Sequence, residues 1–258
     1  LATRVPSTGD WTDLAVRDDT IRELLDLELP CRQREHGRET WTGSGVRALF
    51  RGPSGSGKSL AARLLAAALQ RDLYRVDLSS IVDKYIGETE KNLDRVLSRA
   101  EELDVVLLFD EGDALLTQRT GVGNANDRYA NLETNFLLQR LEAFEGILVV
   151  TTNAGERIDA AFERRMDVVV EFHPAQAAER WALWHLHLPT PHAVPPDFLD
   201  ELASRCVLSG GQIKNAVQHA ALQAMPRGTI DAAMLDAAVR REYRKAGAVC
   251  PLRSVVTA

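Results

Sequence analysis

The sequence predicts an α/β fold in which a doubly wound parallel sheet of five strands is followed by an all-helical part. Five short apolar runs rich in Val, Leu and Ile are typical of strands that are buried on both faces. Amphipathic helical patterns stand between these runs, and strands that alternate with helices indicate a parallel sheet. After Pro174 the strand patterns stop and only helical patterns follow. The expected strands are Val46–Phe50, Leu73–Leu78, Val105–Phe109, Ile147–Thr152 and Val168–Phe172.

These patterns divide the 258 residues into four segments. Residues 1–40 form a lead-in segment with one helix around Thr20–Leu29, which we expect Pro30 to interrupt. Residues 41–174 form the core, residues 175–246 form a helical lid, and residues 247–258 form a tail. The candidates for the three or four helices of the lid are Ala177–Leu188, Asp197–Arg205, Gly211–Met225 and Asp231–Arg244.

A glycine-rich loop with the spacing G-x-x-x-x-G-K-[ST] joins the first core strand to the first core helix. Glycines let the backbone curl so that successive N–H groups point at phosphate oxygens, and the helix amino terminus adds its positive dipole end. Lys58 is expected to reach the β- and γ-phosphates of ATP, and Ser59 to ligate Mg²⁺. A Gly/Ser-rich connector is the alternative, but it rarely has both this spacing and these flanking elements. The binding segment of this P-loop, or Walker A motif, comprises Gly52, Pro53, Ser54, Gly55, Ser56, Gly57, Lys58, Ser59 and Leu60.

Polar residues follow two later strands in a way that fits hydrolysis of the nucleotide. Asp110 and Glu111 come directly after the apolar run 105–109, as in a Walker B motif. We expect Asp110 to hold Mg²⁺ through a water and Glu111 to orient and deprotonate the attacking water. Asn153 follows the strand 147–152, and because ligands bind beyond the carboxyl ends of parallel strands, it is expected to position water beside Glu111. Taken alone, two acids at a strand end are commonplace, and Asn153 fits the start of a loop equally well.

Over about Trp41 to Arg244, the order of these motifs resembles the AAA family of AAA+ ATPases. The family's arginine-finger segment is matched by Ile158–Asp167, and the resemblance implies that Arg164 and Arg165 reach the γ-phosphate bound in the next subunit of a ring, usually a hexamer. This segment lacks the two residues that often separate the arginines in the family, which leaves open which of the pair is the finger. An Arg pair that caps a helix end is the alternative.

The segment Lys84–Asn92 resembles the first pore loop of the same family, in which an aromatic residue, an aliphatic residue and Gly project into the channel of the ring. Here these are Tyr85, Ile86 and Gly87. A flat aromatic ring contacts the backbone and many side chains of an extended polypeptide without needing a particular sequence. The resemblance therefore implies a protein substrate, whereas the alternative is that Tyr85 is an ordinary half-buried residue.

In the helical part, Ser209–Asn215 matches the place where the lid of the family approaches adenine. The resemblance implies nucleotide contacts from Gly211 and Lys214, with Lys214 as a candidate for the sensor-2 cation. Gln212 stands where several branches of the family carry the sensor arginine, and this departure puts sensor 2 in question. A Gly-marked helix start with a solvated Lys is the alternative.

A closer resemblance lies in Asn126–Glu133 and Phe136–Glu142, taken with the pore loop, the 210–215 helix start and the ending Arg240–Tyr243. These stretches resemble the ATPases encoded with phage-tail-like extracellular contractile injection systems. That resemblance implies a role in the assembly or cargo loading of the injection particle.

Composition and charge limit the class of protein. The formal net charge is −6 with no basic block, which disfavours a protein that grips phosphate backbones of nucleic acid. No apolar run approaches the roughly 20 residues of a membrane helix. The three cysteines show none of the paired spacings of zinc sites or disulfide scaffolds, which fits a reducing cytoplasm.

These observations favour an ATP-hydrolysing, protein-remodelling motor that assembles with itself into a ring and acts on a polypeptide. A nucleotide-dependent assembly switch with slow or no hydrolysis is the alternative, although a switch would not require Glu111 or Tyr85. A DNA machine like a clamp loader or a helicase is a third hypothesis, which the acidic charge and the aromatic pore loop disfavour.

Overall fold

The computed structural model describes residues 1–33, 45–76, 88–113, 136, 138–153, 158, 160–225 and 228–252. By its contacts the chain separates into two compact units. The first unit comprises Leu1–Leu14, Asp18–Pro53 and Lys58–Phe172, and the second comprises Ala15–Arg17, Ser54–Gly57 and His173–Ala258. The domain limits expected at residues 40, 174 and 246 stay predictions.

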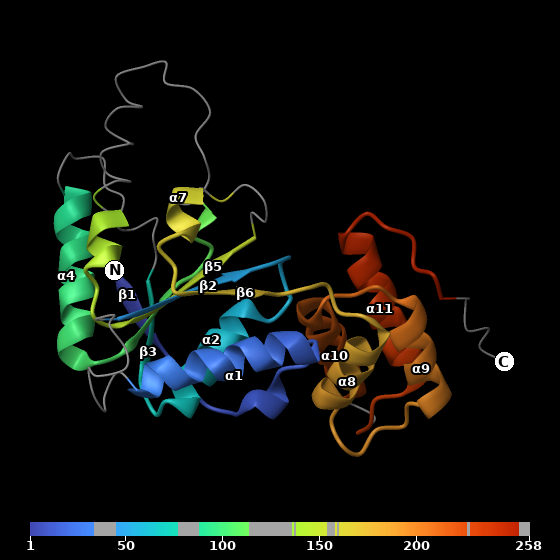
Figure 1. Cartoon of the computed structure of the whole chain (residues 1–258). Coiled ribbons are helices and arrows are strands. Elements are labelled where there is room, and N and C mark those ends of the chain that lie inside the picture. The colour runs from blue at the N-terminus through green and yellow to red at the C-terminus, as the bar shows by residue number, and fades with distance from the viewer. Residues whose placement is uncertain are drawn as a thin grey trace. The chain divides into compact units, whose positions relative to one another are not determined.

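The first unit is built on a six-stranded, mostly parallel sheet (Figure 1). Its strands are β1 (Ala2–Val5), β2 (Val46–Arg51), β3 (Leu73–Val76), β4 (Val106–Phe109), β5 (Ile147–Thr152) and β6 (Val168–Glu171). Their order across the sheet is β1-β3-β4-β5-β2-β6. The strands β2 to β6 pair in parallel, which confirms the α/β fold expected from the apolar runs.

Among the described residues, the antiparallel edge strand β1 is the one strand that the sequence pattern did not predict. It pairs with β3, so that Ala2 lies opposite Val76 and Val5 opposite Leu73. Three of its four residues are exposed, and it contains no apolar run. Such an edge strand takes its conformation from hydrogen bonds to its neighbour rather than from burial, so a pattern based on burial cannot detect it.

Helices cover the sheet and bury the central strands. Alternate residues of a strand point to opposite faces of the sheet. Phe109 of β4 and Val150 of β5 belong to one buried cluster with Leu97 of α4 (Glu88–Leu103). The helix α2 (Lys58–Ala68) packs against β4 and β5, and α1 (Asp18–Gln33) packs against β6 and α2. Both α1 and α2 lie below the sheet in the view of Figure 1. Two short helices, η1 (Trp11–Asp13) and α7 (Ala160–Glu163), complete the described part of this unit.

The helix α1 continues through Pro30, so the expected interruption there is wrong. Leu24 and Leu27 of this helix are 0% and 1% exposed. Full burial of one such side chain stabilises by about 1.5–3 kcal/mol, and a proline inside a helix costs about 3 kcal/mol. Burial of the inner face of α1 is therefore large enough to offset the missing N–H of Pro30, which lies in the last turn.

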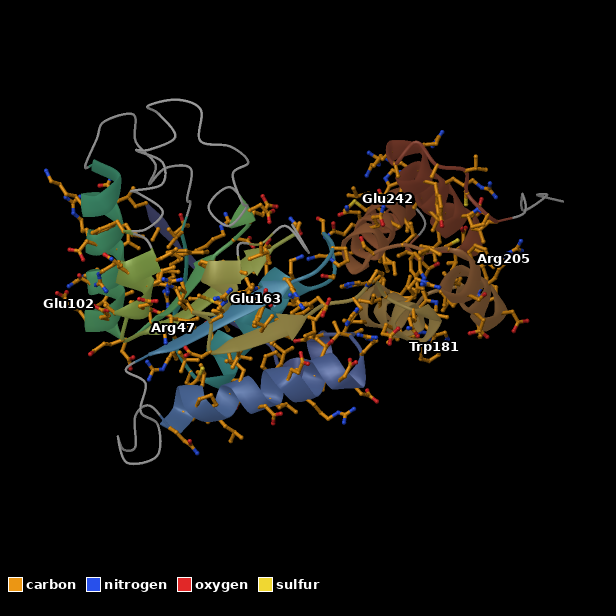
Figure 2. The ribbon with its side chains drawn as sticks, turned by 45° about the horizontal axis from the view of Figure 1, so that its top comes forward. Arg47, Glu102, Glu163, Trp181, Arg205 and Glu242 are labelled. Atoms are coloured by element: carbon orange, nitrogen blue, oxygen red, sulfur yellow. The ribbon has the colours of Figure 1, made fainter. Side chains whose placement is uncertain are left out.

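A bidentate ion pair holds the start of β2 against the residue before β6. The Arg47 guanidinium donates to both carboxylate oxygens of Asp167 at 2.9 Å, and the Arg47 backbone N–H donates to the same carboxylate at 2.8 Å (Figure 2). Paired charges with this fork geometry are among the stronger hydrogen bonds of proteins. The strand that leads into the glycine-rich loop is thereby fixed at its opposite end.

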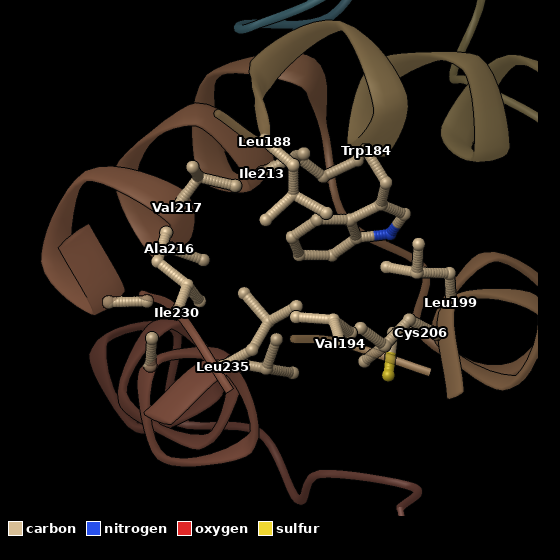
Figure 3. Packing of buried hydrophobic residues seen from close by; sticks show 14 of the residues in the cluster. Trp184, Leu188, Val194, Leu199, Cys206, Ile213, Ala216, Val217, Ile230 and Leu235 are labelled. Atoms are coloured by element: carbon tan, nitrogen blue, oxygen red, sulfur yellow. The ribbon is translucent and has the colours of Figure 1, made fainter. Parts of the chain in front are cut away.

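The second unit contains the four helices that were expected to form the lid, α8 (Ala177–His187), α9 (Pro196–Arg205), α10 (Gly210–Ala224) and α11 (Ala232–Lys245). Each boundary lies within one residue of the expected range, so all four helix predictions are confirmed. The four helices share one hydrophobic core, to which they contribute Trp184, Leu199, Ile213 and Leu235, respectively (Figure 3). No helix in the described part of the chain combines the length and the apolar character that a bilayer crossing requires.

Candidate nucleotide-binding site

The loop that follows β2 has the curled backbone that the glycine spacing predicts. Gly52 and Gly57 have φ angles of +147° and +104°, which side-chain-bearing residues rarely adopt. A Cβ on Gly52 would lie 2.1 Å from the carbonyl oxygen of Phe172, closer than any real contact. Glycine is therefore required at position 52 both for conformation and for space.

Lys58, the first residue of α2, is buried and points back at this loop. Its ammonium donates to the carbonyl oxygens of Gly52 and Pro53 at 2.7 and 2.8 Å, and to Oδ1 of Asn153 at 2.9 Å. Lys58 and Asn153 are 95 residues apart in the sequence. The fold thus joins the P-loop to the asparagine that follows β5.

The charge of Lys58 is sensitive to its surroundings. Burial lowers the pKa of the ammonium below its ordinary value, while the nearby carboxylates of Asp113, Asp110 and Glu111 oppose this shift. A cation in such a place favours an anionic partner, because burial without one is costly.

Ser59 and Asp110 meet at the carboxyl end of β4. The Ser59 hydroxyl donates to Oδ1 of Asp110 at 2.8 Å, and the Thr151 hydroxyl donates to the same oxygen at 2.6 Å. Hydroxyl and carboxylate oxygens are the ligands that Mg²⁺ prefers, and Mg²⁺ is usually held by one or two carboxylates together with water and phosphate oxygens. The pair Ser59 and Asp110 therefore fits a Mg²⁺ ion that accompanies a nucleotide.

Glu111 stands next to Asp110 in an uncommon backbone conformation. Its φ angle is +55°, in the left-handed region, which for a residue other than Gly costs about 1–3 kcal/mol. Its backbone N–H donates to the Thr151 hydroxyl at 3.0 Å, and the N–H of Gly112 donates to the Thr151 carbonyl at 2.8 Å. Hydrogen bonds from β5 therefore hold the turn that carries Glu111.

Asp113 and the two threonines of β5 are residues of this site that the sequence analysis did not assign. Asp113 accepts hydrogen bonds from the Thr152 hydroxyl and, at 3.0 Å, from the backbone N–H of Asn153. The adjacent Thr151 and Thr152 and the spacing Asp110-x-x-Asp113 are visible in the sequence. Their partners, however, lie about 40 residues away along the chain, and local patterns cannot reveal such contacts.

The two arginines after α7 have different surroundings. Arg165 is half-buried and forms an ion pair with Glu142. Arg164, in contrast, is exposed. The preceding residue, Glu163, is held at 3.0 Å by Arg51, the last residue of β2 (Figure 2).

In the second unit, Gly211 and Lys214 lie in the first turns of α10, and both are exposed. Ser209 caps this helix by accepting the N–H of Gln212 at 3.3 Å, and the Gln212 side chain accepts the N–H of Ser209 at 2.8 Å. Gln212 therefore serves as a capping residue in the place where some family members carry an arginine. The roles of Gly211 and Lys214 toward a nucleotide stay predictions.

Several predicted residues lie outside the described residues. They include Asp77 and Leu78 at the end of the expected strand Leu73–Leu78, Tyr85, Ile86 and Gly87 of the expected pore loop, and the stretch Asn126–Glu133.

Comparison with known proteins identifies the family. A model of the ATPase family associated with various cellular activities (AAA) matches residues 48–174. An uncharacterized AAA family ATPase of Sinorhizobium fredii, y4kL, is 32% identical over 175 residues, which are 68% of this chain and 53% of that protein. The ATP-dependent zinc metalloprotease FtsH 3 of Sphaerobacter thermophilus is 30% identical over 241 residues, 90% of this chain and 49% of that protein. The proteasome-activating nucleotidase of Aeropyrum pernix is 28% identical over 228 residues, 85% of this chain and 56% of that protein.

The chain spans about half the length of these relatives. The range matched by the family runs from β2 to just beyond β6 and includes the P-loop, the turn of Asp110 and Glu111, and Asn153. Residues 48–174 of this chain are therefore an ATPase domain of the AAA family.

Proposed function

We propose that the chain binds Mg²⁺ and ATP at the P-loop and hydrolyses ATP to remodel a polypeptide, within a ring of copies of itself, most simply a hexamer. The observation that carries this proposal is the pair of contacts from Lys58 to Asn153 and from Ser59 to Asp110. These contacts bring residues of three separate motifs to the carboxyl ends of β2, β4 and β5, where ligands of parallel sheets bind.

The residues of this chain divide the chemistry among them. The Lys58 ammonium exchanges its neutral acceptors for the β- and γ-phosphate oxygens, to which the loop N–H groups also donate. Ser59 and Asp110 hold Mg²⁺, which when bound neutralises negative charge on the phosphates. Glu111 orients a water molecule and takes its proton, and Asn153 helps to place that water beside the γ-phosphate.

A neighbouring subunit completes the site in this proposal. Arg164 is exposed and Arg165 is paired with Glu142, so Arg164 is the better candidate for an arginine that reaches the next subunit. An arginine supplied in this way stabilises the charge of the transition state. Arg165 then keeps the segment after α7 in place.

The proposed substrate is protein rather than nucleic acid. Two of the relatives are named as a metalloprotease and as a proteasome-activating nucleotidase, and both names refer to proteolysis. The sequence resemblance of the pore loop, Asn126–Glu133 and Phe136–Glu142 supports a narrower role, which is the assembly or cargo loading of a contractile injection particle. The cysteine spacing supports a site of action in the cytoplasm.

The ATPase rate measured against protein concentration, with and without candidate particle proteins, tests this proposal. A motor with shared sites gains specific activity as the ring assembles, and its substrate stimulates it further. Glu111→Gln provides the inactive reference. If the wild-type protein binds ATP and assembles but turns over no faster than Glu111→Gln, the chain is an assembly switch and the motor is excluded.

A further inference from the structure

We infer that Thr151 is a positioning residue that holds both Asp110 and Glu111 through its single hydroxyl group. The hydroxyl donates to Oδ1 of Asp110 at 2.6 Å and accepts the backbone N–H of Glu111 at 3.0 Å. Thr151 is 1% exposed, so water does not compete for these bonds. The inference deepens the proposed function and rests on it.

The register of the sheet explains why Thr151 can make both bonds. β4 and β5 are parallel neighbours, with Phe109 opposite Val150. Asp110, the first residue beyond β4, and Thr151, which is still within β5, are the next residues along the two chains and therefore lie side by side. The N–H of Gly112 also donates to the Thr151 carbonyl at 2.8 Å, so the turn after β4 is bonded to Thr151 through both its backbone and its side chain.

The hydrogen-bonding capacity of the hydroxyl makes this arrangement specific. A threonine hydroxyl has one proton to donate, and here the proton goes to the metal-binding carboxylate while a lone pair accepts the Glu111 N–H. Asp110 Oδ1 also accepts the Ser59 hydroxyl at 2.8 Å. If the Ser59 hydroxyl were to ligate Mg²⁺, the Thr151 hydroxyl would still hold the Asp110 carboxylate in its orientation.

The second bond of Thr151 bears on Glu111. The left-handed φ angle of Glu111 is uncommon and is maintained only while neighbouring groups anchor the turn. Loss of the hydroxyl leaves the Glu111 N–H without this acceptor and lets the turn relax. Removing one oxygen atom therefore affects the metal-binding residue and the proposed base together, while the P-loop contacts to the phosphates remain.

Thr151→Val tests the inference, because valine keeps the shape and loses the hydroxyl. Thr151→Ser keeps the hydroxyl and should recover most of any loss. Thr20→Val is the matched control, since Thr20 is 2% exposed and its hydroxyl donates to the Glu171 carbonyl at 3.0 Å, away from Asp110 and Glu111. If Thr151→Val does not fold, Thr151→Ala replaces it.

Three quantities are measured on each variant. Electron paramagnetic resonance gives the affinity for Mn²⁺ in the presence of a nonhydrolysable ATP analogue. The other two are the affinity for ATP in EDTA and kcat. We expect Thr151→Val to weaken Mn²⁺ binding and lower kcat by about tenfold or more each, the effect of losing a hydrogen bond to a charged group. ATP affinity in EDTA should stay within about twofold, since the Lys58 and loop contacts persist.

The outcomes separate the inference from the proposed function. If the wild-type protein hydrolyses ATP and Thr151→Val keeps the native Mn²⁺ affinity and kcat, the inference is overturned and the proposed function stands. A Thr151→Val variant that only melts earlier, as Thr20→Val does, would also overturn it by showing a purely structural role. A wild-type protein that binds neither ATP nor Mn²⁺ with the analogue would overturn the proposed function and the inference with it.

Discussion

Replacing Lys58 with Met tests the centre of the site with little change in side-chain volume. Lys58 is 7% exposed, and its ammonium contacts Gly52 O, Pro53 O and Asn153 Oδ1 at 2.7–2.9 Å. Met fills the same space with an unbranched apolar chain. The substitution therefore removes the cation while leaving the surrounding side chains in contact.

The expected loss of ATP affinity follows from the bonds that the cation exchanges. A charge-assisted hydrogen bond contributes about 1.5–3 kcal/mol, so contacts to the β- and γ-phosphates together contribute about 3–6 kcal/mol. Each 1.4 kcal/mol is tenfold in affinity, which gives a range of about 10²–10⁴-fold. In the wild-type protein Lys58 must first give up its three present acceptors, so we expect the lower end, about a hundredfold.

Isothermal titration calorimetry with Mg²⁺ and ATP measures this loss, with Lys245→Met as control because Lys245 is half-exposed and pairs with Glu242. A folded Lys58→Met variant with undiminished ATP affinity would show that the loop is not the binding site.

The pH dependence of stability and of ATP affinity gives a second test of Lys58. Because the pKa of Lys58 is lowered in the folded state, the unfolded chain binds more protons in the alkaline window between the two values, and stability rises with pH there. ATP affinity falls over the same window as Lys58 loses its proton, and Lys58→Met should abolish both trends.

Four further variants test the remaining roles. Glu111→Gln keeps the shape and loses the base, so we expect near-native ATP affinity and turnover at least about a hundredfold slower; native turnover in a coupled ATPase assay would remove Glu111 from the mechanism. Arg164→Ala should lower the rate of hydrolysis and should inhibit wild-type subunits when the two proteins are mixed. Arg165→Ala breaks the ion pair with Glu142 and should mainly lower the melting temperature. If activity falls linearly with the fraction of Arg164→Ala in the mixture, a shared site is excluded. Tyr85→Ala should abolish translocation of an unfolded polypeptide while ATP turnover stays within about threefold of wild type, and a parallel loss of melting temperature and ATPase rate would contradict the pore-loop assignment.

Local sequence patterns were sufficient for most of the fold. The strands β2 to β6 follow apolar runs, and the helices α8 to α11 follow a 3.6-residue periodicity, because the burial of a strand or of one helix face dictates such patterns. The P-loop was equally visible, since the positive φ angles of Gly52 and Gly57 demand residues without a side chain. The acids after β4 and Asn153 after β5 could be placed on the same sheet edge because parallel strands share their direction.

The tertiary structure decided what depends on partners far away in the chain. The edge strand β1 forms because β3 offers it hydrogen bonds, and α1 passes Pro30 because its inner face is buried. Arg164 and Arg165 are identical neighbours in the sequence, and their burial and the ion pair of Arg165 with Glu142 distinguish them in the structure. The sequence pattern indicates only that Thr151 lies in a strand. The pairing register of β4 and β5 brings its hydroxyl into contact with Asp110 and with the N–H of Glu111. A hydrogen bond depends on the direction and distance of both of its groups, and a sequence fixes these only for groups that are near each other along the chain.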